Sequence, residues 1–337
     1  MPGGGLSRRA RASEAVPWAA RTITWSLPIP PPPPTTLPAV TVVIPTFNRR
    51  GVLGRAIDSV LRNAGPPLDV VVVDDGSTDG TARWVRATYA DDDRVRVLEK
   101  PNGGCGSARN VGARHAHHAY VAYLDSDDRA EPGRFARQAA ALEAHPQADL
   151  CIGDAHLEDA RGRPAGRMYA HKGFVAPLSL EAMFHGAWAA PSTWMVRTEV
   201  ARALPFDETI PFQEDVAYLF SLFREGRRVH VLDEVVCTYR VAGDDTGATR
   251  LSDQQSGMDA AWAKVHRENW ERLGDADRAH IRRPAHVHRR LAKHYLRTRD
   301  YARARPHCQA WWRSRPHRLR PLLRWLECVA RARGSTP

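Results

Sequence analysis

The chain lacks the features that mark several large classes of protein. Its 337 residues include five cysteines and no Cys-x-x-Cys pair, so neither a disulfide framework nor a zinc site is predicted, and a reducing compartment is expected. No apolar run approaches the ~18 residues that cross a membrane. No apolar stretch follows the basic N-terminus, so no secretory signal is expected. Hydrophobic residues make up 43%, which excludes a wholly disordered chain.

Lysine is scarce as well, because only four of the 49 basic residues are lysines. The formal net charge of +11 is unevenly spread: residues 278–337 carry 17 basic and two acidic side chains, and residues 1–277 have a slight acidic excess. A basic tail indicates a polyanionic partner. An anionic membrane surface is favoured, with Trp311, Trp312 and Trp325 at the interface, and nucleic acid is disfavoured because no recognition motif is present. The alternative is a solvated helical surface. The expected location is cytoplasmic, peripheral at the inner membrane face.

Three segments differ in composition. Residues 1–37 form a Pro-rich leader, predicted to be disordered around a stiff polyproline segment. Residues 38–252 carry the alternating apolar patterns of a folded α/β domain. Residues 253–337 show helical apolar spacing and are predicted to be a basic α-helical extension.

Short apolar runs alternate with helical patterns in the first part of the α/β domain. Strands are predicted at 40–44, 70–73, 95–98 and 120–124. Nearly continuous apolar strands separated by helices indicate a parallel sheet covered on both faces. Because the carboxyl ends of parallel strands meet at one edge, where open α/β sheets bind ligands, a ligand site is expected there.

Acidic residues gather after these strands and before a later helix. Asp74 and Asp75 follow the second strand, residues 125–128 follow the fourth, and Glu214 and Asp215 open the later helix. Crowded carboxylates repel one another unless a cation joins them. No His or Cys set with zinc spacing is present, so Mg²⁺ or Mn²⁺ is favoured over zinc. The alternative for each cluster is a polar turn or helix cap.

Five motifs in a fixed order resemble those of the family 2 glycosyltransferases, which have the GT-A fold. They are Val43 to Asn48, Val72 to Thr81, Asn102 to Asn110, the D-x-D motif Leu124 to Asp128, and Phe206 to Asp215. The resemblance covers about residues 40–245. It implies a Rossmann-like, mostly parallel central sheet flanked by helices. It also implies the inverting, metal-dependent transfer of a sugar from a nucleoside-diphosphate sugar to a hydroxyl group. The favoured donor is a UDP-sugar. The acceptor would be a glycan, a lipid-linked molecule or a small molecule.

The same resemblance implies which residues bind the donor. The nucleotide-sugar side would consist of Pro45, Thr46, Phe47, Asn48, Asp74, Asp75, Gly103, Gly104, Arg109, Asn110, Asp125 and Ser126. Asp75 is favoured for the uracil side, and Asp127 with Asp125 would hold the metal that bridges the diphosphate. For Arg109, the alternative is an ordinary surface residue.

On the acceptor side, the resemblance implies that Asp215 is the catalytic base, which removes the proton from the attacking hydroxyl. The alternative is that Asp215 only caps a helix. Glu214, Trp188 and Trp194 would lie beside the acceptor, and for either tryptophan the alternative is a place in the core.

One position departs from the family pattern. A His often follows the Tyr-Arg pair after the last strand, and Ala242 stands there instead. Asp244, Asp245 or water would then replace it, or the metal would be held more weakly.

Two other functions compete with an active transferase. A non-catalytic GT-A-like module would bind a nucleotide-sugar or a polyanion through the basic tail. A nucleotidyltransferase is disfavoured, because residues 45–48 lack the Gly-rich basic loop of that class.

Overall fold

The structure is a computed structural model, which describes residues 36–159, 161–169, 178–241, 255–275, 278, 281, 285–314, 316 and 319–333. The predictions for the leader up to residue 35, and for Ala242, Asp244 and Asp245, lie outside these residues.

A nine-stranded sheet forms the centre of the molecule, in the order β3-β2-β1-β4-β8-β6-β9-β5, with β7 beside β6. The strands are β1 (Val40–Thr46), β2 (Leu68–Asp74), β3 (Val95–Glu99), β4 (Tyr120–Tyr123), β5 (Arg129–Ala130), β6 (Leu150–Glu158), β7 (Pro164–Arg167), β8 (Trp194–Arg197) and β9 (Val229–Arg240). The first four strands pair in parallel, as predicted. The other half is mixed, because β8 runs antiparallel to both β4 and β6, whereas β6 and β9 are parallel.

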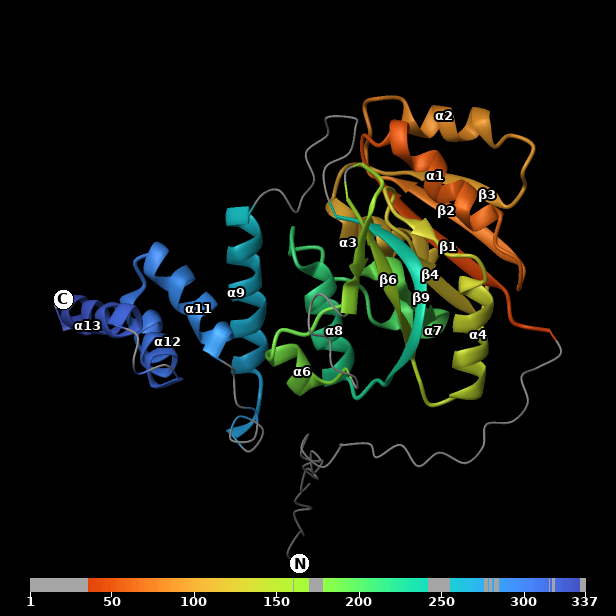
Figure 1. Ribbon diagram of the computed structural model, residues 1–337. Coiled ribbons are helices and arrows are strands. Elements are labelled where there is room, and N and C mark those ends of the chain that lie inside the picture. The colour runs from red at the N-terminus through yellow and green to blue at the C-terminus, as the bar shows by residue number, and fades with distance from the viewer. Residues whose placement is uncertain are drawn as a thin grey trace, which may run out of the picture.

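Helices cover both faces of this sheet (Figure 1). Those of the first part are α1 (Arg50–Leu61), α2 (Thr81–Thr88), α3 (Gly104–Arg114), α4 (Arg134–Ala144), α6 (Leu180–Phe184), α7 (Thr198–Ala203) and α8 (Glu214–Arg224). Val70 and Val72 of β2 pack in a core with residues of α1 and α4, whereas Val71 and Val73 pack in a second core with residues of α3 and α8. This alternation follows from the two-residue period of a strand, and explains why the strand is apolar throughout.

Helix α3 packs very close to β1. This close packing fixes the start of α3 at the carboxyl edge of the sheet. A Cβ atom at Gly112 would be 2.2 Å from Cγ1 of Val43, so only glycine fits there without movement of the strand.

Two elements differ from the sequence-based expectations. The apolar stretches 229–231 and 235–241 of the sequence predict two separate closing strands. In the structure both belong to the single strand β9, whose register with β6 shifts near Asp154. The hydroxyl residues Ser77 and Thr78 are candidate caps for the helix that the sequence predicts after them. In the structure, the Thr81 N–H at the start of α2 donates to Oδ1 of Asp79 at 3.0 Å instead.

The C-terminal helices are α9 (Gln255–Glu271), α11 (Ala285–Arg297), α12 (Tyr301–Ser314) and α13 (Leu319–Arg333), and they lie to one side of the sheet (Figure 1). They form a core of their own, which includes Trp262, Leu291 and Cys308. Helix α9 joins the two parts, because its Val265 packs in the core of the sheet. Among the residues that the structure describes, no helix is both long and apolar enough to cross a membrane.

Candidate active site

The loops after β1 and β2 are tied together at the carboxyl edge of the sheet. The Asn48 N–H donates to Oγ of Ser77 at 2.9 Å, and Oδ1 of Asn48 accepts from the Thr78 N–H at 2.8 Å. Asn48 has a φ of 54°, a left-handed conformation that asparagine tolerates better than most residues. Pro45 and Thr46 are buried at the end of β1, whereas Phe47 is 45% exposed and presents its ring at the edge.

Asp75 is bound within the chain at the start of α3. Its carboxylate accepts hydrogen bonds from Nζ of Lys100 at 2.5 Å, from the Gly103 N–H at 3.0 Å and from the Gly104 N–H at 2.7 Å. An anion is favourable at a helix N-terminus. Its neighbour Asp74 accepts from the Ser77 N–H at 2.7 Å. Contact of Asp75 with a base stays a prediction. Lys100 was missed by the sequence reasoning, although it is one of only four lysines and follows a predicted strand.

Arg109 joins the D-x-D turn to the start of α8. Its Nη2 donates to Oδ1 of Asp125 at 2.7 Å, and its Nη1 donates to Oε1 of Glu214 at 2.8 Å. Its side chain is only 3% exposed, so the alternative of a surface residue is wrong. Burial alone would lower the pKa of Arg109, but the charges of Asp125 and Glu214 raise it well above its ordinary value. Glu214 therefore has a buried partner, and its acceptor-side role stays a prediction.

Asn110 was expected on the nucleotide side, and the structure places it elsewhere. Its Nδ2 donates to the Phe206 carbonyl and to Oε1 of Glu208, each at 2.9 Å, and its Oδ1 accepts from the Phe206 N–H at 2.8 Å. Both amide groups are used in a buried contact, so Asn110 fixes the Phe206 segment on α3 rather than reaching a ligand.

The D-x-D turn is held by its last acid. Asp128 is buried, accepts from Oγ of Ser192 at 2.6 Å and accepts from the Arg240 N–H at 3.0 Å. Burial, followed by the charges of Asp127 and Asp125, raises the pKa of Asp128 well above its ordinary value. Ser126 is buried, Asp127 is half-buried, and the Asp125 side chain keeps 27% of its surface exposed. The turn therefore leaves Asp125 and Asp127 as the accessible carboxylates.

Asp215 lies half-buried in the first turn of α8, after Gln213 with a φ of 63°. The indole N–H of Trp188 donates to its Oδ2, and the Val216 N–H donates to its Oδ1 at 2.8 Å. Burial and then the charge of Glu214 raise the pKa of Asp215 to about 7, against the lowering effect of those two hydrogen bonds and of Arg109. A carboxyl group with this pKa exchanges a proton readily near neutral pH, as general-base chemistry requires.

The two tryptophans expected beside the acceptor have different places. Trp194 is 0% exposed and lies parallel to the Phe206 ring, with centroids 6.3 Å apart, so its acceptor-side role is wrong and it belongs to the core. Trp188 is half-buried, packs edge-on against Tyr239 and contacts the Asp215 carboxylate.

The fold and this acidic edge define an α/β sheet of the GT-A type. Residues 41–204 match the family model described as "Glycosyl transferase family 2". Residues 41–204 are thus similar to a family 2 glycosyltransferase domain, in agreement with the five motifs of the sequence.

Relatives and solved structures agree with this assignment. The chain is 32% identical over 213 residues to the "Uncharacterized glycosyltransferase EpsJ" of Bacillus subtilis, a match of 60% of this chain and 61% of EpsJ. It is 38% identical over 119 residues to a hyaluronan synthase of Pasteurella multocida, and this match covers 35% of this chain and 12% of the synthase. The chain thus spans less than two thirds of the length of these relatives.

Two similar solved structures carry nucleotide-sugars. S. aureus TarS 1-349 in complex with UDP-GlcNAc has a TM-score of 0.55 and 20% identity, over 86% of this chain and 79% of that one. The mannosyltransferase PcManGT of Pyrobaculum calidifontis, in complex with GDP-Man and Mn²⁺, has a TM-score of 0.55 and 19% identity, over 95% of this chain and 81% of that one. At this identity they establish the fold.

Proposed function

We propose that the chain is a metal-dependent, inverting glycosyltransferase, which moves a sugar from a nucleoside-diphosphate sugar to an acceptor hydroxyl. The observation that carries the proposal is the buried Arg109, which bonds to Asp125 at 2.7 Å and to Glu214 at 2.8 Å. It brings the D-x-D turn and the start of α8 to one place. This proximity supports a single site for the proposed donor-side acids and for Asp215, as a reaction between two substrates requires.

The accessible acids suit a hard divalent cation. No cluster of three or more metal-ligating side chains occurs among the described residues, so the protein would supply two carboxylates, from Asp125 and Asp127. Mg²⁺ or Mn²⁺ at such a site keeps positions open for phosphate oxygens and water. When bound, the metal would neutralise charge on the diphosphate leaving group. Arg109 would orient Asp125 toward the metal, and the Asp128–Ser192 hydrogen bond would hold the D-x-D turn in place.

Asp215 is the proposed base. Its pKa of about 7 leaves a large ionised fraction at neutral pH, and the Trp188 N–H fixes one of its oxygens. It would take the proton from the acceptor hydroxyl as that oxygen attacks the anomeric carbon and the diphosphate leaves. A single displacement of this kind inverts the anomeric centre. Because one similar structure holds UDP-GlcNAc and another GDP-Man, the choice of a UDP-sugar rests on the motif resemblance alone.

Two single substitutions test this function. Asp127→Ala and Asp215→Asn are each expected to lower metal-dependent transfer or donor hydrolysis by ~10²-fold or more, assayed over a panel of nucleotide-sugars. Calorimetry with UDP and Mn²⁺ should show binding lost in Asp127→Ala and kept in Asp215→Asn. The control is Asp91→Asn, on an exposed turn before β3. This variant should keep wild-type activity and an unchanged circular dichroism spectrum.

The outcomes separate the competing functions. Nearly full transfer by Asp215→Asn would remove the base assignment. Donor binding by the wild type without turnover on any acceptor would instead favour the non-catalytic module.

We further propose that the enzyme lies on an anionic membrane surface, at the inner face, through residues 278–337. Leu319, Leu323 and Leu326 of α13 are 70%, 62% and 47% exposed, and their spacing puts them on one stripe of the helix. A second copy is a poor partner for this stripe, since two segments with 17 basic and two acidic residues each would repel. A negative bilayer matches both the leucines and the charge. The tryptophans contribute less than expected, because Trp312 and Trp325 stack on each other at 5.9 Å.

A further inference from the structure

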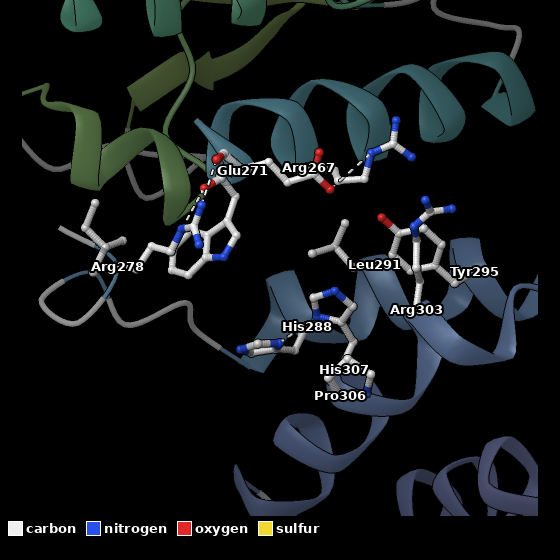
Figure 2. A pocket seen from close by; sticks show the side chains of 11 residues that line it. Arg267, Glu271, Arg278, His288, Leu291, Tyr295, Arg303, Pro306 and His307 are labelled. Atoms are coloured by element: carbon white, nitrogen blue, oxygen red, sulfur yellow. Dashed lines mark hydrogen bonds and ion pairs between the residues drawn. The ribbon is translucent and has the colours of Figure 1, made fainter. Parts of the chain in front are cut away.

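Basic side chains do not make a cavity an anion site where acids or carbonyl oxygens already bind them. A cavity of about 470 Å³ between α9, α11 and α12 is an example (Figure 2). Its Arg303 pairs with Asp300 at 2.7 Å, and Nη2 of its Arg278 donates to the carbonyl oxygen of Glu271 at 2.7 Å. The arginines of this cavity are already engaged, so it offers little to an anion.

A second cavity in the same helices has a different lining. It measures about 270 Å³ and lies between α11, α12 and α13. Its wall includes His286, Arg289, Lys293, Trp311, Arg320 and Pro321. Among the residues that the structure describes, the lining contains basic side chains from two helices, an aromatic ring and no carboxylate.

Unlike the arginines of the first cavity, the cations of this second cavity have no partner among the described residues. Within the described ranges, Arg289, Lys293 and Arg320 form no ion pair or side-chain hydrogen bond. Neighbours on the same helices do: Arg290 reaches Asp259 at 3.1 Å, and Arg324 reaches Glu327 at 2.8 Å. Like charges four residues apart on a helix, such as Arg289 and Lys293, are unfavourable by themselves. An anion between these helices would relieve that repulsion.

We propose that this cavity, which we call the α11–α13 cavity, binds a phosphate ester. The guanidinium groups of Arg289 and Arg320 match phosphoryl oxygens with paired N–H donors, and Lys293 adds a compact positive charge. Trp311 and Pro321 supply an apolar wall for the organic part of the ester. The volume lies just below the ~300 Å³ at which drug-sized sites begin, so a sugar phosphate or a lipid headgroup fits and a whole nucleotide-sugar does not.

This site is separate from the donor site and does not rest on the proposed transfer reaction. All its lining residues belong to the C-terminal helices and their connections, outside the region matched by the family model. One wall is tied to the catalytic part, because Nε2 of His286 lies 3.0 Å from the carbonyl oxygen of His185, next to α6. The site is thus held at a fixed place relative to the sheet.

The test uses the full chain and two sources of the same chemistry. Glycerol 3-phosphate is titrated by calorimetry and Trp fluorescence, and vesicles of phosphatidylglycerol are compared with vesicles of phosphatidylcholine. Lys293→Ala and Arg320→Ala should each weaken binding about 10-fold, the effect of removing one charge-assisted hydrogen bond. Arg324→Ala is the matched control, because it removes the same charge from α13 but loses a side chain already paired with Glu327.

The results decide both the site and its ligand. Site-dependent binding of glycerol 3-phosphate supports the proposal with a soluble ester as ligand, and site-dependent binding of phosphatidylglycerol vesicles alone supports it with a lipid headgroup. The proposal is overturned if neither probe binds, or if Arg324→Ala weakens binding as much as Lys293→Ala and Arg320→Ala do. Unchanged thermal unfolding of all three variants shows that they fold.

Discussion

The hydrogen bond from Trp188 to Asp215 lowers the pKa of the proposed base, against the larger raising effects of burial and of the Glu214 charge. A donor to a carboxylate stabilises the ionised form and lowers the pKa, so Trp188→Phe should raise the pKa of Asp215 above its value of about 7. The acidic limb of the kcat profile should then move to higher pH. The variant should lose activity near pH 7 and recover it near pH 9, measured as kcat against pH with saturating substrates.

The control for this substitution is the same change, tryptophan to phenylalanine, at a position away from Asp215. Trp84 packs edge-on against Tyr89 with ring centroids 6.1 Å apart, on the opposite face of the sheet, so Trp84→Phe should leave the pH profile unchanged. If Trp188→Phe lowers activity equally at every pH, Trp188 only packs against Tyr239 and does not tune the base.

Arg109 is the residue on which the site depends for stability. Arg109→Met would leave Asp125 and Glu214 without their shared partner, and removing one member of a buried ion pair costs ~3–5 kcal/mol. The free energy of unfolding, measured with urea, should fall by about that amount. Arg114→Met, on the exposed side of the same helix, should change it by less than ~0.5 kcal/mol. Equal effects of the two substitutions would contradict the bridging role.

At the scale of the elements, the sequence predicted best where one strong pattern decides the structure. The strands β1, β2 and β4 are buried on both faces, so most of their residues are apolar and lie next to one another in the sequence. The strand β9 was predicted as two because its middle, at Asp233 and Glu234, is exposed and polar. The pairing with β6 that keeps this stretch in one strand is a tertiary contact, which no local pattern reports.

The site shows the same limit. The motifs located the acids, but their partners lie far along the chain: Lys100 is 25 residues from Asp75, and Glu214 is 105 residues from Arg109. The pairing of β2 with β3 brings Lys100 beside Asp75, and the packing of α3 and α8 on the sheet brings Arg109 and Glu214 together. For Trp194, the choice between the acceptor side and the core stayed open for a similar reason, because its burial depends on Phe206 and Tyr218 from other segments.

The leucine stripe of α13 is the element that should hold the enzyme on a bilayer. Leu323 lies in the middle of the stripe and is 62% exposed, so Leu323→Glu should not disturb the fold. It should lower sedimentation with phosphatidylglycerol vesicles severalfold, because a charge replaces the apolar contact and opposes the negative surface. Binding should also fall as salt screens the basic tail.

A matched charge elsewhere is the control for this effect. Thr88→Glu adds one negative charge at the exposed end of α2, so it should leave sedimentation nearly unchanged. No sedimentation of the wild type at low salt would exclude membrane binding altogether, and equal losses in both variants would assign it to net charge rather than to the stripe.

On the scale of the whole molecule, the sheet part and the helical part differ in net charge as well as in fold. The sheet half contains the acids of the site, and the helices that follow α9 carry the positive excess. The net charge of +11 therefore says nothing about the chemistry at the sheet edge. It bears on the two proposals for the helical part. These are binding to an anionic membrane surface and binding of a phosphate ester in the α11–α13 cavity.

Donor binding should be visible as stability of the whole domain, because a ligand that binds only the folded state stabilises it. UDP at 100 times its Kd should add ~2.7 kcal/mol, seen as a rise in Tm with Mn²⁺ present. EDTA should reverse the metal-dependent part of the rise, since the diphosphate would lose the cation that links it to Asp125 and Asp127. Asp127→Ala should remove that part, and Asp91→Asn should keep it. An equal rise with Mn²⁺ and with EDTA would show that the diphosphate is held without a metal, and the buried charge of Arg109 would then be the group to test next.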